Sequence, residues 1–111
     1  MNENNFINRD TKKDFLSSEQ KTYKIKKVRK RDGKIVDFDP YRIYYAIERA
    51  MKATGKYDKE TLEKVTDYVI KVLEEKYGEE GIPNVEEIQD IVELALLKFD
   101  LYEVAKAYIS Y

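Results

Sequence analysis

The pair Asp32-Gly33 constrains the fold of this 111-residue chain more than any other feature, because it stands between two short runs of β-prone residues. Tight hairpin turns need positive φ angles, which glycine adopts without a Cβ clash. We therefore expect a two-residue turn within a β-hairpin spanning residues 24–38. Asp39-Pro40 follows directly: the aspartate can accept hydrogen bonds from free helix amides, and proline fits the first helical position. The sequence thus predicts a hairpin that leads straight into a helix.

A two-residue turn also fixes the pairing of the strands. Lys30 would lie opposite Ile35, and Val28 would lie opposite Asp37. Each face of the hairpin then mixes apolar with charged side chains, whereas a plain surface hairpin usually separates them. We expect one face to cover a helical layer and the other to help line a site.

Both parts of the hairpin–helix junction attract phosphate. The hairpin carries Lys30, Arg31 and Lys34, and the predicted helix start carries Arg42. The free amides at a helix start, together with the helix dipole, also favour anions. The junction is therefore the candidate binding region of the chain.

The first two helices after the hairpin have clear stop signals. One helix is expected over residues 40–53, with Gly55 as its C-terminal cap. The next is expected over residues 59–77 and is stopped by Gly78.

Two further helices are predicted from their start signals. Asn84 with Glu87 three residues later is typical of a capping box, and Asp100 with Glu103 repeats the pattern. The expected buried faces of the four helices are Ile43, Ala46, Ile47, Ala50 and Met51; Leu62, Val65, Val69, Val72, Leu73 and Lys76; Ile88, Ile91, Val92, Ala95 and Leu96; and Val104, Ala105, Tyr108 and Ile109.

The length of the chain fits a single α+β domain with a modest core. Residues 1–23 are mostly polar and show no sustained hydrophobic period, so we expect a flexible N-terminal tail or arm. Residues 24–111 would form the domain.

Composition excludes several kinds of chemistry. Cysteine and histidine are absent, which rules out disulfides, thiolate metal sites and His-based acid–base catalysis. The 21 basic and 22 acidic residues give a net charge of −1, which argues against a general polyanion binder. No apolar run approaches a membrane span, and no signal-peptide core follows the N-terminus. The sequence predicts a non-catalytic cytoplasmic protein with no metal site of its own.

The residues around the junction match a known pattern. The order Val28-x-Lys30-Arg31-Asp32-Gly33-x-x-x-x-Phe38-Asp39, then Arg42-Ile43-x-x-Ala46-Ile47-x-x-Ala50, resembles the ATP-cone domain. The later runs Val85-x-x-Ile88-Gln89-x-x-Val92-Glu93 and Val104-Ala105-x-Ala107-Tyr108-Ile109-x-Tyr111 are also similar to that domain, in the form that heads anaerobic ribonucleoside-triphosphate reductases. The resemblance covers residues 24–111.

The resemblance implies a fold and a function. The fold would be a small β-hairpin or three-stranded sheet capping a four-helix cluster. The domain would be a regulatory sensor of a ribonucleotide reductase, in which ATP leaves the enzyme active and dATP in the same site switches it off. Magnesium would accompany the triphosphate. The implied partners are a catalytic or radical-generating reductase subunit and, with nucleotide, a second copy of the chain.

The resemblance also implies roles for individual residues. Lys30 and Arg31 would contact phosphates, Arg42 would add a second cation, and Asp32-Gly33 would shape the turn. Val28, Phe38 and Ile43 would touch the adenine or sugar, and the segment from Val85 to Gln89 would close the phosphate side. Many relatives have a hydroxyl residue where this chain has Asn84-Val85, so one phosphate ligand is missing here.

The sequence is also compatible with other functions. The segment from Lys21 to Lys34 holds eight cations and one acid, so it could instead serve a nucleic-acid-binding or protein-interaction module, or be a solvated basic edge. The tyrosines of the first and last helices fit core-edge packing better than a subunit interface. The carboxylates of residues 74–87 are expected to solvate helix ends.

Overall fold

The computed structural model describes residues 23–110, so the predicted tail lies, apart from Tyr23, outside the described residues. The described elements are β1 (Lys27–Arg29), β2 (Ile35–Asp37), α2 (Pro40–Ala53), α3 (Lys59–Tyr77), α4 (Val85–Lys98) and α5 (Tyr102–Ser110). They confirm the α+β class, with a two-stranded antiparallel sheet and four helices.

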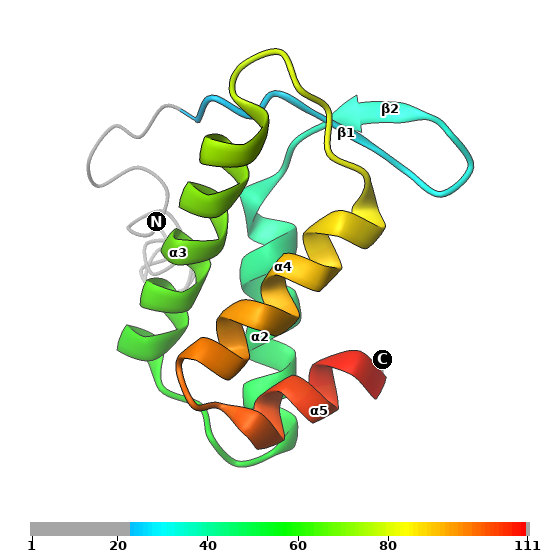
Figure 1. Ribbon diagram of the computed structural model, residues 1–111. Helices are drawn as coiled ribbons and strands as arrows, with labels where there is room; N and C mark the ends of the chain where they lie inside the picture. The colour runs from blue at the N-terminus through cyan, green and yellow to red at the C-terminus, as the bar shows by residue number, and fades with distance from the viewer. Residues whose placement is uncertain (1–22, 111) are drawn as a thin grey trace, which may run out of the picture.

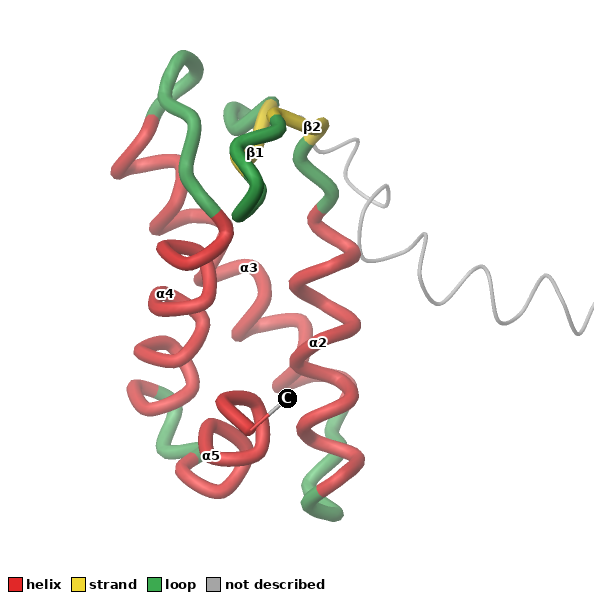
Figure 2. Tube along the Cα trace, turned by 90° about the vertical axis from the view of Figure 1, so that its right-hand side faces the viewer, coloured by secondary structure: helices red, strands yellow, loops and turns green. Residues whose placement is uncertain are grey.

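The hairpin caps one end of the helix cluster (Figure 1). In the rotated view, α2 and α4 stand on opposite sides beneath the hairpin, and α5 crosses at the far end (Figure 2). α2 packs against α3 and α5, and α4 packs against the same two helices. This arrangement makes α2 and α4 the two side walls below the hairpin.

The strand register differs by one residue from the prediction. Val28 pairs with Val36, and Arg29 pairs with Ile35. The expected pairing of Val28 with Asp37 is therefore wrong. The shift places two valines opposite each other, so that they share one face of the hairpin.

The register shifts because the hairpin loop has three residues, 31–33, rather than two. The Gly33 amide donates to the Lys30 carbonyl (2.9 Å), and the Lys30 amide donates to the Lys34 carbonyl (2.8 Å). Gly33 has a φ of 89°, the left-handed geometry that follows a type I turn in three-residue hairpin loops. The Asp32 carboxylate accepts the Lys34 amide (2.9 Å) and closes the loop.

Most helix ends follow their predicted signals. Asp39 caps α2 by accepting the Tyr41 amide (3.0 Å). At the start of α4, Asn84 accepts the Glu87 amide (2.8 Å) while the Glu87 carboxylate accepts the Asn84 amide (3.2 Å). The predicted capping box is therefore confirmed.

Asp100 does not start the last helix, so that prediction is wrong. It has a φ of 62° and lies just after α4. Its amide donates to the Leu97 carbonyl (3.0 Å), and the Leu101 amide donates to the Leu96 carbonyl (2.8 Å). This is a Schellman ending for α4, with aspartate in the place that glycine usually takes. The Asp100 carboxylate instead accepts the hydroxyl of Tyr102 (3.0 Å).

The core lies between the four helices and confirms most of the expected faces. In α3 the buried stripe is wider than predicted, because this helix packs against both α2 and α4. It includes Thr66 and Ile70, whereas Lys76, expected on that stripe, is exposed. The Thr66 hydroxyl donates to the Leu62 carbonyl (2.8 Å), which satisfies its burial.

The tyrosines divide between packing and exposure. Tyr44 is only 2% exposed and belongs to the core, although it was outside the expected stripe of its helix. Tyr23 packs against the core as well, with its ring edge-on to Phe38. Tyr102 and Ile109 on α5 are largely exposed, so Ile109 does not join the buried face predicted for it.

Candidate functional site

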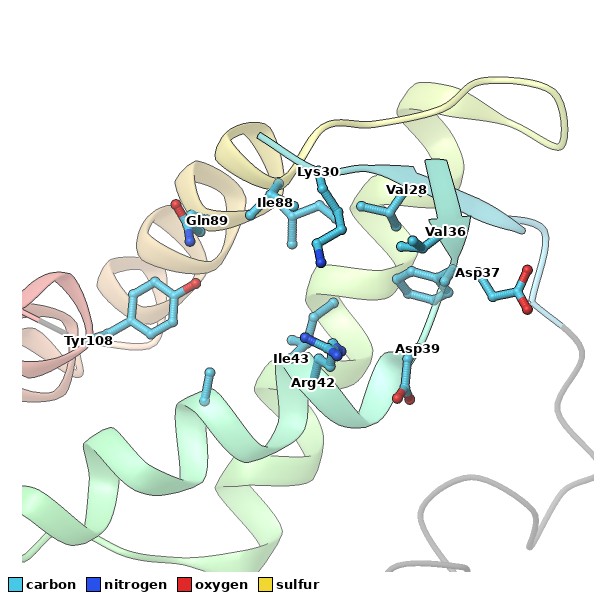
Figure 3. Close-up of a pocket in the computed structure, with 13 residues that line it drawn as sticks. Val28, Lys30, Val36, Asp37, Asp39, Arg42, Ile43, Ile88, Gln89 and Tyr108 are labelled. Atoms are coloured by element: carbon cyan, nitrogen blue, oxygen red, sulfur yellow. The ribbon is translucent and has the colours of Figure 1, made fainter. Parts of the chain in front are cut away.

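A cavity of about 510 Å³ lies beneath the hairpin. Its walls come from the hairpin, from the first half of α2, from the start of α4 and from α5 (Figure 3). The volume is within the range of small-molecule sites. Elements distant in sequence therefore enclose one space.

Seven of the ten candidate site residues line this cavity. They are Val28, Lys30, Phe38, Arg42, Ile43, Val85 and Gln89. The other three, Arg31, Asp32 and Gly33, form the hairpin loop and are not part of the lining. The structure thus gathers the candidates from the strands and helices and sets the loop residues apart.

Two cations enter the cavity from different elements. Lys30 follows β1, and Arg42 lies in the first turn of α2, which Asp39 and Pro40 start. Figure 3 shows the Lys30 ammonium extending from the hairpin toward the Arg42 side of the cavity. Among residues 23–110, neither side chain has a carboxylate within 4.0 Å. No carboxylate of the described residues therefore neutralises their positive charge.

Apolar side chains form the wall next to these cations. Val28 and Ile43 are 8% and 6% exposed, and both belong to the cavity lining. Phe38 is half-buried, held by an edge-on contact with Tyr23 at 6.2 Å between ring centroids. Val36, which pairs with Val28 across the hairpin, adds a more exposed apolar surface. The cavity is suited to a ligand with an apolar part and an anionic part.

Tyr108 brings a hydroxyl from α5, and Figure 3 shows it directed toward the cavity. Burial raises the pKa of Tyr108 to about 12, and the carboxylates of Glu93 and Asp90 add to that rise. The hydroxyl therefore stays protonated at neutral pH and can donate a hydrogen bond. Gln89 offers amide donors and an acceptor from α4.

The two acids in the lining are directed elsewhere. The carboxylate of Asp37 points away from the cavity (Figure 3) and pairs with Lys27. The hydrogen bond and the positive charge of Lys27 lower the pKa of Asp37 below its ordinary value of 3.8. Asp39 is engaged at the amide of Tyr41 as the helix cap. Neither carboxylate therefore forms an ion pair with Lys30 or Arg42.

The loop residues have their own contacts. The Arg31 guanidinium Nε lies 3.1 Å from an oxygen of Glu86, in the first turn of α4. Asp32 and Gly33 hold the turn through the Asp32–Lys34 hydrogen bond and the positive φ. Glu86, expected only to solvate a helix end, is therefore a contact between α4 and the hairpin.

A backbone contact also joins the hairpin to the start of α4. The Arg29 amide donates to the Pro83 carbonyl (2.9 Å), and Arg29 forms a single parallel bridge with Asn84. The third strand considered from sequence is thus reduced to this one bridge beside a two-stranded sheet. Because Asn84 also caps α4, the bridge helps hold Val85 and Gln89 at the cavity.

Six lining residues were not named individually as site residues, although one of them, Ile88, lies within the predicted segment from Val85 to Gln89. They are Val36, Asp37, Asp39, Ala46, Ile88 and Tyr108. Ala46 follows Arg42 by four residues, and Ile88 follows Val85 by three, so helical spacing alone would have placed both on the cavity side. Tyr108 has no such local signal, since only the packing of α5 brings it there.

The sequence was also compared with known proteins. The family model of the ATP cone domain matches residues 26–111. The chain belongs to the ATP-cone domain family. The match includes every strand and helix described above, so the hairpin and the helix cluster together make up the ATP-cone domain. ATP-cone domains generally act as nucleotide-sensing allosteric regulators of ribonucleotide reductases.

Relatives of this ATP-cone chain are ribonucleoside-diphosphate reductases. Subunit alpha from Chlamydia pneumoniae is 42% identical over 89 residues, which cover 74% of this chain and 8% of that protein. The vitamin B12-dependent reductase of Thermoplasma acidophilum is 40% identical over 92 residues, or 78% of this chain. The corresponding enzyme of Mycobacterium tuberculosis is 40% identical over 85 residues, or 77%. The chain spans 12% of the length of each of these two enzymes.

Two features are absent from the described part of this ATP-cone domain. Among residues 23–110, no helix has both the length and the apolar composition needed to cross a membrane. Over the same residues, no group of three or more aspartate or glutamate side chains is placed to hold a metal ion.

Proposed function

We propose that this ATP-cone domain binds ATP and dATP in the cavity beneath the hairpin. The observation that carries the proposal is the composition of that cavity. Two cations that have no carboxylate partner among residues 23–110 stand beside a wall of buried apolar side chains. An adenine nucleotide has a matching division into a flat base with apolar faces and a polyanionic tail.

The proposed site assigns parts of the nucleotide to parts of the cavity. Lys30 and Arg42 would hold the phosphates, with Arg31 reaching them from the loop. Val28, Phe38 and Ile43 would contact the adenine or sugar, and Val85 and Gln89 would close the phosphate side. The magnesium ion would be carried by the phosphates, since the neighbouring acids Asp37 and Asp39 already have partners. Asp32 and Gly33 would contribute by holding the loop.

We further propose a regulatory role in a ribonucleotide reductase. The named relatives are reductases of which this chain matches only a small part. The domain itself would be non-catalytic and would respond to the ratio of ATP to dATP, with ATP permitting activity and dATP stopping it. Its partner would be a catalytic or radical-generating subunit, and nucleotide would alter the association of subunits or of copies of this domain.

The test is calorimetric titration of the chain with ATP and with dATP in the presence of magnesium. We expect saturable binding of both. Replacing Lys30 or Arg42 by alanine removes one charge-assisted contact and should cost about 1.5–3 kcal/mol, roughly a ten- to hundredfold loss of affinity.

The matched control is Lys26→Ala, which removes an exposed cation just before β1 that does not line the cavity. This variant should bind nearly as tightly as the wild type. Absence of saturable binding at millimolar nucleotide would contradict the proposal. So would equal losses in all three variants, since the effect would then be one of net charge. Oligonucleotide binding that weakens steeply with salt would instead favour the nucleic-acid alternative.

A further inference from the structure

The contact between Arg31 and Glu86 has no role in the nucleotide site as proposed so far. It joins the hairpin loop to the first turn of α4, with 3.1 Å between Nε and Oε2. Both side chains remain accessible, at 71% and 52% exposure. The guanidinium is therefore occupied by a carboxylate but not sealed from other anions.

The first turn of α4 holds two acids with different tasks. Glu87 is engaged in the capping box with Asn84. Glu86 is left to pair across to the hairpin. Both carboxylates also offset the attraction that a helix start exerts on incoming anions. Glu86 thus opposes phosphate binding in two separable ways, by occupying Arg31 and by its charge.

We propose that Glu86 competes with the phosphates of the nucleotide for Arg31, and so weakens the binding of ligands whose phosphate chain reaches this guanidinium. The inference rests on the proposed nucleotide site. Carboxylate and phosphate offer the same kind of acceptor oxygens to a guanidinium, and a phosphate chain carries more charge than one carboxylate. An exposed ion pair is weak enough to be exchanged. A ligand that brings no phosphate gains nothing from breaking it.

The experiment compares ATP and adenosine binding to the wild type and to Glu86→Gln by calorimetric titration. An exposed ion pair is worth about 0.2–1 kcal/mol, so releasing Arg31 should tighten ATP binding by roughly 1.5- to 5-fold. Adenosine binding should not change. Glu79→Gln, which removes an exposed carboxylate after α3, is the matched charge control and should leave ATP binding near the wild-type value.

A double-mutant cycle separates competition from simple charge. In the Arg31→Ala background, the gain in ATP affinity from Glu86→Gln should shrink to the part due to charge alone, because the guanidinium for which Glu86 and phosphate compete has gone. A gain of undiminished size there, or an equal gain in Glu79→Gln or for adenosine, overturns the inference. Unchanged ATP affinity in Glu86→Gln overturns it as well while leaving the nucleotide site intact. Absence of ATP binding by the wild type contradicts the proposed function itself.

Discussion

At the scale of single residues, four positions among residues 23–110 have a positive φ, and two of them end the hairpin loop and α4. Gly33 ends the hairpin loop with a φ of 89°, and Asp100 ends α4 with a φ of 62°. Glycine takes this geometry without strain, whereas an aspartate does so at a cost that local hydrogen bonds offset. The loop that presents Lys30 to the cavity therefore depends on a glycine backbone.

Gly33→Ala tests this dependence. A Cβ at this position would meet no other atom within 4 Å, so the cost comes from the backbone angle alone. We expect a loss of about 1–2 kcal/mol in the free energy of unfolding, measured by urea denaturation. Gly33→Asn is the control, because asparagine tolerates left-handed geometry better and should lose less. Equal stability of the alanine variant and the wild type would show that the loop adopts another turn.

Two predictions from the sequence were wrong at the scale of single residues. Asp32-Gly33 correctly indicated a hairpin, but the pair does not distinguish a two-residue from a three-residue loop. The strand register predicted from a two-residue loop is therefore wrong by one residue. Asp100 with Glu103 has the same pattern as a helix start, yet the backbone uses Asp100 to end α4. In both cases the local residue pattern is compatible with two geometries and does not determine which one the backbone adopts.

At the scale of elements, the start of α4 has three connections. Asn84 caps the helix, bridges to Arg29 of β1, and precedes Val85 in the cavity wall. The hairpin and α4 are thus coupled through backbone as well as through the Arg31–Glu86 pair. The capping box was readable from sequence because its partners lie three residues apart. The bridge between Asn84 and Arg29 of β1 could not be predicted from the sequence, because these two residues are far apart in the chain.

Asn84→Ala should remove the cap acceptor and destabilise the domain by about 0.5–2 kcal/mol in urea denaturation. Because the same residue sits beside the cavity wall, ATP affinity should fall too. Asn84→Asp keeps an acceptor oxygen at the helix start and should stay close to the wild type in stability. A stable alanine variant with unchanged ATP affinity would contradict the coupling.

At the scale of the whole molecule, acid stability follows from three carboxyl groups whose pKa is lowered in the folded state, those of Asp37, Asp58 and Glu87. The Thr61 hydroxyl, and then its amide, lower the pKa of Asp58, and Lys27 lowers the pKa of Asp37. A carboxyl whose pKa is lower in the folded state stabilises that state above the unfolded pKa, here 3.8 for the aspartates. That stabilisation is lost as the pH falls through the folded-state pKa. The chain has no histidine, so no ordinary side-chain pKa lies near neutrality.

The melting temperature should therefore change little between pH 6 and 8 and fall below about pH 4. Asp58→Asn keeps an acceptor at the cap of α3 but loses the charge. Its melting temperature should lie below that of the wild type at pH 7 and approach the wild-type value at about pH 2. Thermal unfolding followed by circular dichroism across this range is the measurement. A difference that stays constant with pH would assign the effect of Asp58 to something other than its ionisation.

The cavity draws its walls from the first strand of the described chain and from its last helix, with Val28 at one extreme and Tyr108 at the other. No shorter stretch of the sequence encloses it. A partly folded domain, or one in which α5 has detached from the other helices, would bind a nucleotide only weakly. Nucleotide binding would then require the fully folded domain. The domain would therefore respond to the nucleotide concentration only after its own folding is complete.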